Sequence, residues 1–137
     1  MTDIPTTPEL KASAERHETA SLISSEKVEG TAVYDPAGTW LGSIQSVMID
    51  KLSGQVSYAV LSFGGFLGLG KKFFPVPWSQ LRYEPSKEGY VTTITEGRLS
   101  SAPAYDDMES WDDHDWRDSL ERHYGMDPDL ARTGGSV

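Results

Sequence analysis

The sequence predicts a small, mainly β domain of the antiparallel β-barrel type, followed by a C-terminal helix. Three observations support this fold class: short runs of β-branched and aromatic residues, turn sequences between those runs, and one helical apolar stripe near the end of the chain. A chain of 137 residues is long enough for one domain. It has no cysteine, which excludes disulfides, thiol catalysis and cysteine-based zinc sites.

Charge and composition divide the chain into three segments, 1–21, 22–103 and 104–137. The first is polar, with four acids and two bases, and is expected to be a disordered leader. The second carries seven acids and seven bases and contains the β-type runs of the barrel. The third carries ten acids and three bases, so an acidic helix and tail hold most of the net charge of −9. Direct binding to nucleic acid is therefore not expected, because phosphates attract clustered lysine and arginine.

Six β-type runs are expected, and two of their connections have clear turn chemistry. Asp35–Gly38 combines proline and glycine, and Lys51–Gly54 follows Asp50, which is expected to cap that turn. A change in the alternation of apolar positions between Ile44 and Val47 predicts a β-bulge. The runs are Thr31–Tyr34, Leu41–Asp50, Gln55–Phe63, Lys72–Val76, Leu81–Glu84 and Gly89–Ile94.

The run Gln55–Phe63 is apolar on both faces, so both faces are expected to be covered. The inner face of a small barrel is covered by its own core. Three covers remain open for the outer face: the C-terminal helix, the glycine-rich connection or a second subunit. One face carries Val56, Tyr58 and Val60, and the other carries Ala59, Leu61 and Phe63.

The glycine-rich run Gly64–Lys71 contains the spacing G-x-x-x-x-G-K of a phosphate-binding loop. Lys72 occupies the position where such a loop needs serine or threonine for magnesium. The next residues, Phe73–Pro77, include two prolines and cannot begin the helix that would face a phosphate. We therefore interpret the run as a structural hairpin.

The apolar tip of this hairpin is a candidate interface. Its exposed side chains either fold back onto the barrel or contact a second copy, and contact with an unrelated protein is a third possibility. Together with the doubly apolar strand, the candidate interface residues are Tyr58, Phe63, Phe66, Leu67 and Leu69.

The segment Glu109–Tyr124 is expected to be one helix. An apolar stripe at i, i+4 and i+8 (Trp116, Leu120 and Tyr124) would dock it, and Gly125 is expected to end it. The acidic run Asp112–Asp115 includes one histidine, but adjacent helical residues point in different directions and cannot converge on one ion. We therefore predict no metal site, no cofactor and no catalytic residue.

Three motifs carry a resemblance to a known family. Residues 30–42 read G-x-x-V-Y-D-x-x-G-x-x-L-G, residues 56–68 read V-x-Y-A-V-L-S-F-G-G-F-L-G, and Val76–Trp78 reads V-P-W. These motifs resemble the PRC-barrel family, which includes the cytoplasmic domain of the photosynthetic reaction-centre H subunit and the C-terminal barrel of a ribosome-maturation factor. The tail from Ala102 to Gly125 resembles stand-alone alphaproteobacterial members. The resemblance implies a β-barrel that binds proteins and has no shared catalytic residues.

Two functions follow as expectations. The first is a non-enzymatic protein-interaction or assembly module that forms a homodimer and binds a protein partner whose identity the sequence does not give. The alternative is an accessory factor in RNA processing or ribosome assembly, by analogy with the family. The sequence contains neither a long apolar span nor a secretory signal pattern, so we expect a cytoplasmic protein without membrane insertion.

Overall fold

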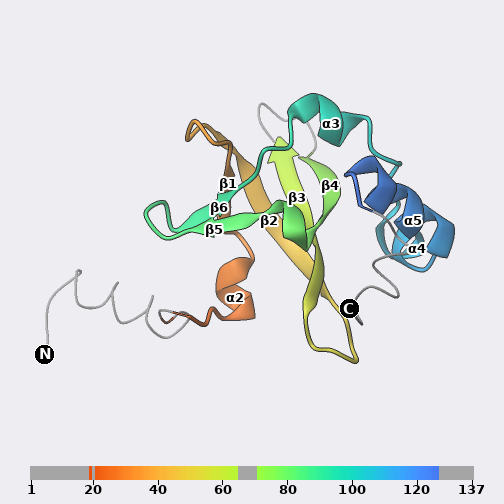
Figure 1. The fold of residues 1–137 in the computed structure, drawn as a ribbon, viewed down its shortest axis with the longest axis horizontal. Coiled ribbons are helices and arrows are strands. Elements are labelled where there is room, and N and C mark those ends of the chain that lie inside the picture. Colours follow the sequence, from red (N-terminus) through yellow and green to blue (C-terminus); the bar gives the residue numbers. More distant parts are fainter. Residues whose placement is uncertain (1–18, 20, 65–70, 127–137) are drawn as a thin grey trace, which may run out of the picture.

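The computed structural model describes residues 19, 21–64 and 71–126, and the fold there is mainly β, with one six-stranded sheet and short helices (Figure 1). The predicted leader 1–21 lies outside the described residues except at positions 19 and 21. The elements are α2 (Ser25–Val28), β1 (Ala32–Tyr34), β2 (Trp40–Ile49), β3 (Val56–Gly64), β4 (Lys71–Pro77), the 3-10 helix η1 (Trp78–Gln80), β5 (Arg82–Glu84), β6 (Gly89–Val91), α3 (Glu96–Ser100), α4 (Asp107–Trp111) and α5 (His114–His123).

The strands follow the order β4-β3-β2-β1-β6-β5. Four of the neighbouring pairs are antiparallel, as the short turns between consecutive strands require. The pair β1–β6 is parallel, which differs from the wholly antiparallel sheet expected from the sequence. The strands β2 to β5 lie between β1 and β6 in the sequence, so no short turn joins β1 to β6. Without a hairpin to reverse the chain, β6 can run in the same direction as β1. In the described part of the chain, β4 and β5 form the two ends of the sheet, and η1 connects them.

Local turn chemistry is confirmed at both predicted turns. The N–H of Gly38 donates to the carbonyl oxygen of Asp35 at 2.9 Å, and Gly38 has φ of +92°. Asp50 Oδ1 accepts from the backbone N–H groups of the two turn residues Leu52 and Ser53, and Gly54 has φ of +78°. These glycines occupy the left-handed region, where a side chain would be strained. The bulge in β2 is also present, as a register shift between Ile44 and Ser46.

The glycine-rich run connects two paired strands. Gly64 at the end of β3 pairs with Lys71 at the start of β4, and a strand follows where a phosphate-binding loop would need a helix. The hairpin interpretation is therefore confirmed. The predicted interface residues Phe66, Leu67 and Leu69 lie outside the described residues.

The C-terminal region forms two helices, so the prediction of one helix over Glu109–Tyr124 is wrong. The helix is interrupted between α4 and α5 because Asp113 caps the N-terminus of α5. Asp113 Oδ1 accepts hydrogen bonds from the N–H of Asp115 at 3.0 Å and from that of Trp116 at 3.2 Å. At the other end, Gly125 has φ of +81° and ends α5 as predicted.

Candidate interaction surface

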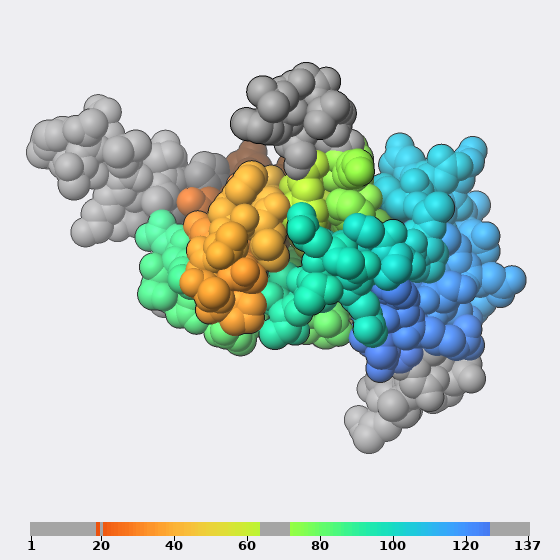
Figure 2. Space-filling view, turned by 90° about the horizontal axis from the view of Figure 1, so that it is seen from above, coloured from red at the N-terminus to blue at the C-terminus, as the bar shows by residue number. Residues whose placement is uncertain are grey.

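Both faces of β3 are covered within the chain. Five consecutive β3 residues, 58–62, are buried. The helices α4 and α5 gather on one side of the sheet, shown in blue in Figures 1 and 2. Trp111 lies with its ring centroid 4.9 Å from that of Tyr58, and Leu120 is fully buried in the same core. Of the three covers left open by the sequence, the C-terminal helices are therefore the one found over Tyr58.

Tyr58 forms the polar link between β3 and α5. Its hydroxyl donates a hydrogen bond to Glu121 Oε2 across 63 residues of sequence. Burial raises the pKa of Tyr58 well above its usual value, and the bond to Glu121 raises it further. Tyr58 is only 9% exposed, so the structure places this predicted interface residue in an internal contact.

Two aromatic residues complete the layer that covers Tyr58. The indole N–H of Trp111 donates to the Tyr105 hydroxyl at 3.1 Å, and that of Trp116 donates to the carbonyl oxygen of Ala104 at 2.6 Å. The rings of Trp111 and Trp116 meet edge to face at 5.1 Å. Trp111 therefore packs α4 against β3, and Trp116 packs α5 against Trp111 and the segment before α4.

Phe63 is half-buried and also packs internally. Its ring centroid lies 5.3 Å from that of Phe74, and it covers Gly42 so closely that a side chain at position 42 would overlap the ring. The described structure therefore uses two of the five predicted interface residues, Tyr58 and Phe63, for packing within the chain.

The tip of the β2–β3 hairpin, residues 49–55, is exposed and carries two apolar side chains. β4 pairs with β3 only as far as Tyr58, opposite Pro77, so β2 and β3 continue beyond it as a two-stranded ribbon (Figure 1). At its end Ile49 is 53% exposed and Leu52 is 99% exposed. Neither residue is among the interface residues predicted from the sequence. The signal that could have found them is a leucine inside a turn otherwise made of polar residues and glycine.

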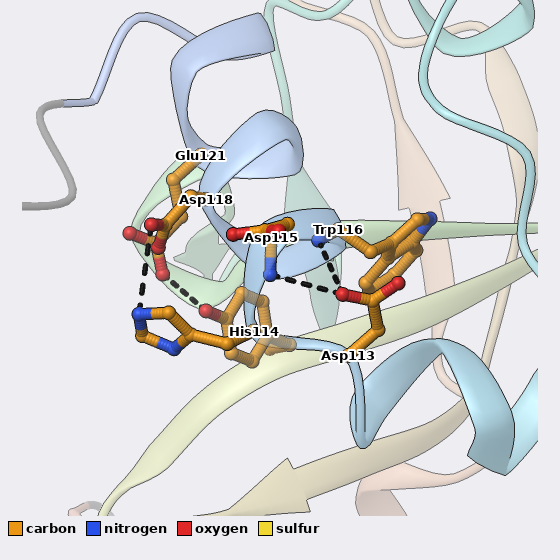
Figure 3. Close-up of polar contacts among 7 residues, drawn as sticks. Asp113, His114, Asp115, Trp116, Asp118 and Glu121 are labelled. Carbon is orange, nitrogen blue, oxygen red and sulfur yellow. Dashed lines mark hydrogen bonds and ion pairs between the residues drawn. The ribbon is translucent and has the colours of Figure 1, made fainter.

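A groove of about 500 Å³ separates the hairpin from α5. His114 Nε2 lies 3.6 Å from Asp118 Oδ2, and both share one side of α5 with Glu121 (Figure 3). On the hairpin side of the groove Asp50 contributes a negative charge, and backbone hydrogen bonds from Ser53 and Leu52 hold its pKa below its usual value. The lining residues are Asp50, Ser57, Tyr58, Pro77, His114, Arg117, Asp118, Glu121 and Met126.

The acidic run Asp112–Asp115 spans the junction between α4 and α5. Asp113 caps α5 and His114 faces Asp118 one turn later, as Figure 3 shows. Among residues 19, 21–64 and 71–126, no group of three or more histidine, aspartate or glutamate side chains is arranged to hold a metal ion.

The β4 edge of the described sheet is poorly suited to pairing with another strand, and Pro75 and Pro77 on it are fully buried. Pro75 and Pro77 stand opposite Val60 and Tyr58 in the β3–β4 ladder. Proline has no N–H, so within a ladder it occupies positions that face away from the neighbouring strand. The outer edge of β4 therefore lacks donors at two positions, a common protection against edge-to-edge association.

The comparisons identify the family. Residues 21–99 match the PRC-barrel domain, which is more than half of the chain, and the chain belongs to this family. The match covers the sheet and α3 and ends before α4 and α5. A search of curated proteins found no similar sequence. Within the described residues, no helix is long and apolar enough to cross a membrane.

Proposed function

We propose that the protein is a non-enzymatic interaction module of the cytoplasm that self-associates through the hairpin tip, residues 49–55. The observation that carries this proposal is the pair of apolar side chains, Ile49 and Leu52, at the end of a ribbon that extends beyond the rest of the sheet. Single exposed apolar residues are common on protein surfaces. Here two such residues lie on the same projecting tip, where together they offer apolar area for a contact.

A second copy of the chain is the partner that fits this tip. Between the two apolar residues lie Asp50 and Lys51, which carry opposite charges. In a two-fold symmetric dimer the same surface of both copies forms the interface, so Asp50 of each copy can face Lys51 of the other. Tyr58 is covered by α4 and α5, and prolines block the β4 edge, so these surfaces compete poorly for the same role.

The size of the tip predicts a weak dimer. Burying an aliphatic side chain contributes about 1.5–3 kcal/mol, so four such side chains from two copies contribute at most about 6–12 kcal/mol. Association costs about 4–15 kcal/mol in lost freedom. With the smallest of these costs, a gain of about 8–12 kcal/mol leaves about 4–8 kcal/mol in favour of association, which corresponds to a millimolar to micromolar dissociation constant. The proposed dimer therefore requires nearly complete burial of all four side chains, and it should depend on concentration.

Sedimentation equilibrium over about 10 μM to 1 mM tests the proposal. The wild-type chain should change from monomer to dimer, and the double variant Ile49→Ser, Leu52→Ser should remain monomeric. Met108→Ser is the matched control, since Met108 is 61% exposed but lies on α4. A further variant, Phe66→Ser with Leu69→Ser, tests the glycine-rich connection as the interface. A wild-type chain that stays monomeric throughout would contradict self-association.

The acidic C-terminal helices favour a second candidate, an accessory factor in RNA processing or ribosome assembly. Residues 104–126 carry eight acids and two arginines, a charge that suits a basic ribosomal protein. Co-sedimentation with ribosomal subunits at low and high salt distinguishes the candidates. Binding at low salt that is lost at high salt supports this function, and no binding at low salt excludes it.

A further inference from the structure

A second groove, of about 270 Å³, lies where the described part of the chain begins. The segment before α2 forms one side of it, and η1, β5 and β6 contribute the rest. All of its lining residues are uncharged, and most of them are apolar or aromatic. The most buried of them are Leu81 and Tyr90, which are 8% and 5% exposed.

Three aromatic side chains form a cluster in this groove. The ring centroids of Trp78 and Tyr83 each lie 5.2 Å from that of Tyr90, and both pairs meet edge to face. Tyr90 is buried, whereas Trp78 and Tyr83 are half-buried and keep part of their surface accessible. Leu22 adds an apolar side chain that is 72% exposed. The groove therefore offers aromatic and aliphatic surface that a ligand can reach.

A proline-containing segment is the class of ligand that suits this lining. Segments in the polyproline II conformation dock in aromatic-lined grooves, and they lose little entropy because they are already extended before they bind. The uncharged lining does not balance the charge of a phosphate, carboxylate or ammonium group, and burying an unbalanced charge is costly.

The sequence that leads into the groove contains such a segment. Residues 4–8 read Ile-Pro-Thr-Thr-Pro, which has the P-x-x-P spacing and is the longest uncharged run within 1–18. These residues lie outside the described part of the chain. Ten residues, 9–18, join them to Thr19, which lines the groove. Short tethers give effective concentrations on the order of millimolar, so even a weak contact can be occupied within one chain.

We propose that Pro5 and Pro8 of the leader dock on the aromatic rings of Trp78 and Tyr83 in the same chain. The leader thereby occupies the groove, and a proline-rich segment of another protein enters it only by displacing the leader. This contact is separate from the proposed self-association, because no residue of the hairpin tip, 49–55, lines the groove.

Paramagnetic relaxation in NMR spectra of the full chain tests this proposal. The chain has no cysteine, so Thr2→Cys carries a single spin label close to the two prolines in the sequence. The indole N–H signal of Trp78, assigned with the variant Trp78→Phe, should lose most of its intensity. The indole signals of Trp111 and Trp116 should keep theirs, because α4 and α5 lie on the other side of the sheet from α2 (Figure 1).

Two leader variants distinguish docking through the prolines from the mere proximity of a tethered segment. Pro5→Ala with Pro8→Ala should restore the Trp78 signal, whereas the matched control Thr6→Ala should leave the loss unchanged. All three substitutions precede the family domain at residues 21–99, so they leave its core intact. No loss at Trp78, or a loss that the proline substitutions leave unchanged, would overturn the proposal. A loss seen only when spin-labelled chains are mixed with isotope-labelled chains lacking the spin label would also overturn it, because the leader of a second copy would then be the occupant.

Discussion

Replacing Leu120 with alanine tests the docking of α5 on the sheet. Leu120 is fully buried and belongs to the same core as Tyr58 and Trp111. A buried leucine-to-alanine change removes the transfer free energy of the lost methyl groups and leaves a cavity, at a cost of about 2–5 kcal/mol. With a urea dependence of about 2 kcal/mol per M, a loss of about 3 kcal/mol lowers the unfolding midpoint by about 1.5 M.

Urea unfolding followed by circular dichroism measures this change, and hydrogen exchange of the α5 amides locates it. Met108→Ala is the control: this side chain is 61% exposed on α4, and its replacement should change stability by less than about 0.5 kcal/mol. If Leu120→Ala costs less than about 1 kcal/mol, or leaves α5 exchange unchanged, the helices do not form a layer of the core.

Two further predictions concern the turns and the buried tyrosines. Gly54→Ala should destabilise the protein by about 1–2 kcal/mol, because Gly54 has φ of +78° and a side chain is strained there. Gly97→Ala in α3 should be neutral or stabilise the protein by up to about 1 kcal/mol, because alanine favours the helix. Thermal unfolding of the two variants measures both changes. Burial raises the pKa of Tyr58 and Tyr124, the latter to about 12, while an unfolded tyrosine titrates near pH 10. The folded state therefore keeps protons that the unfolded state loses, and urea midpoints should fall from about pH 10 upward, less steeply in Tyr124→Phe. A midpoint independent of pH from about 9 to 12 would contradict this.

The turns and the bulge could be predicted from the sequence because short-range chemistry determines them. Asp35, Gly38, Asp50 and Gly54 act through their own backbone conformation or through hydrogen bonds to residues a few positions away. The family motifs lie in the same strands and turns, and the match over residues 21–99 agrees with them.

The break between α4 and α5 could not be predicted from the apolar stripe. In one continuous helix, Trp111 would be five residues before Trp116, about 140° away around the axis. The interruption between α4 and α5, where Asp113 caps α5, removes that constraint. Trp111 can then pack on Tyr58 while Trp116 packs on Trp111. The position of this interruption depends on tertiary packing, and the spacing of apolar residues along the sequence gives no information about that packing.

The candidate surface was only partly predictable for the same reason. The pattern of β3 correctly required a cover on both faces, but three covers were compatible with it. The docking of α4 and α5 decides where Tyr58 lies, and the end of β4 at Pro77 decides that Ile49 and Leu52 extend beyond the sheet.

Disulfide cross-linking at the hairpin tip is the most direct test of the proposed self-association. The chain has no cysteine, so Ser53→Cys introduces a single thiol at the exposed tip and leaves Ile49 and Leu52 in place, and Met108→Cys introduces one on α4 as a control. Under mild oxidation, non-reducing electrophoresis should show rapid formation of a covalent dimer for Ser53→Cys and slow formation for Met108→Cys. Equal rates for the two variants would contradict an interface at the hairpin tip.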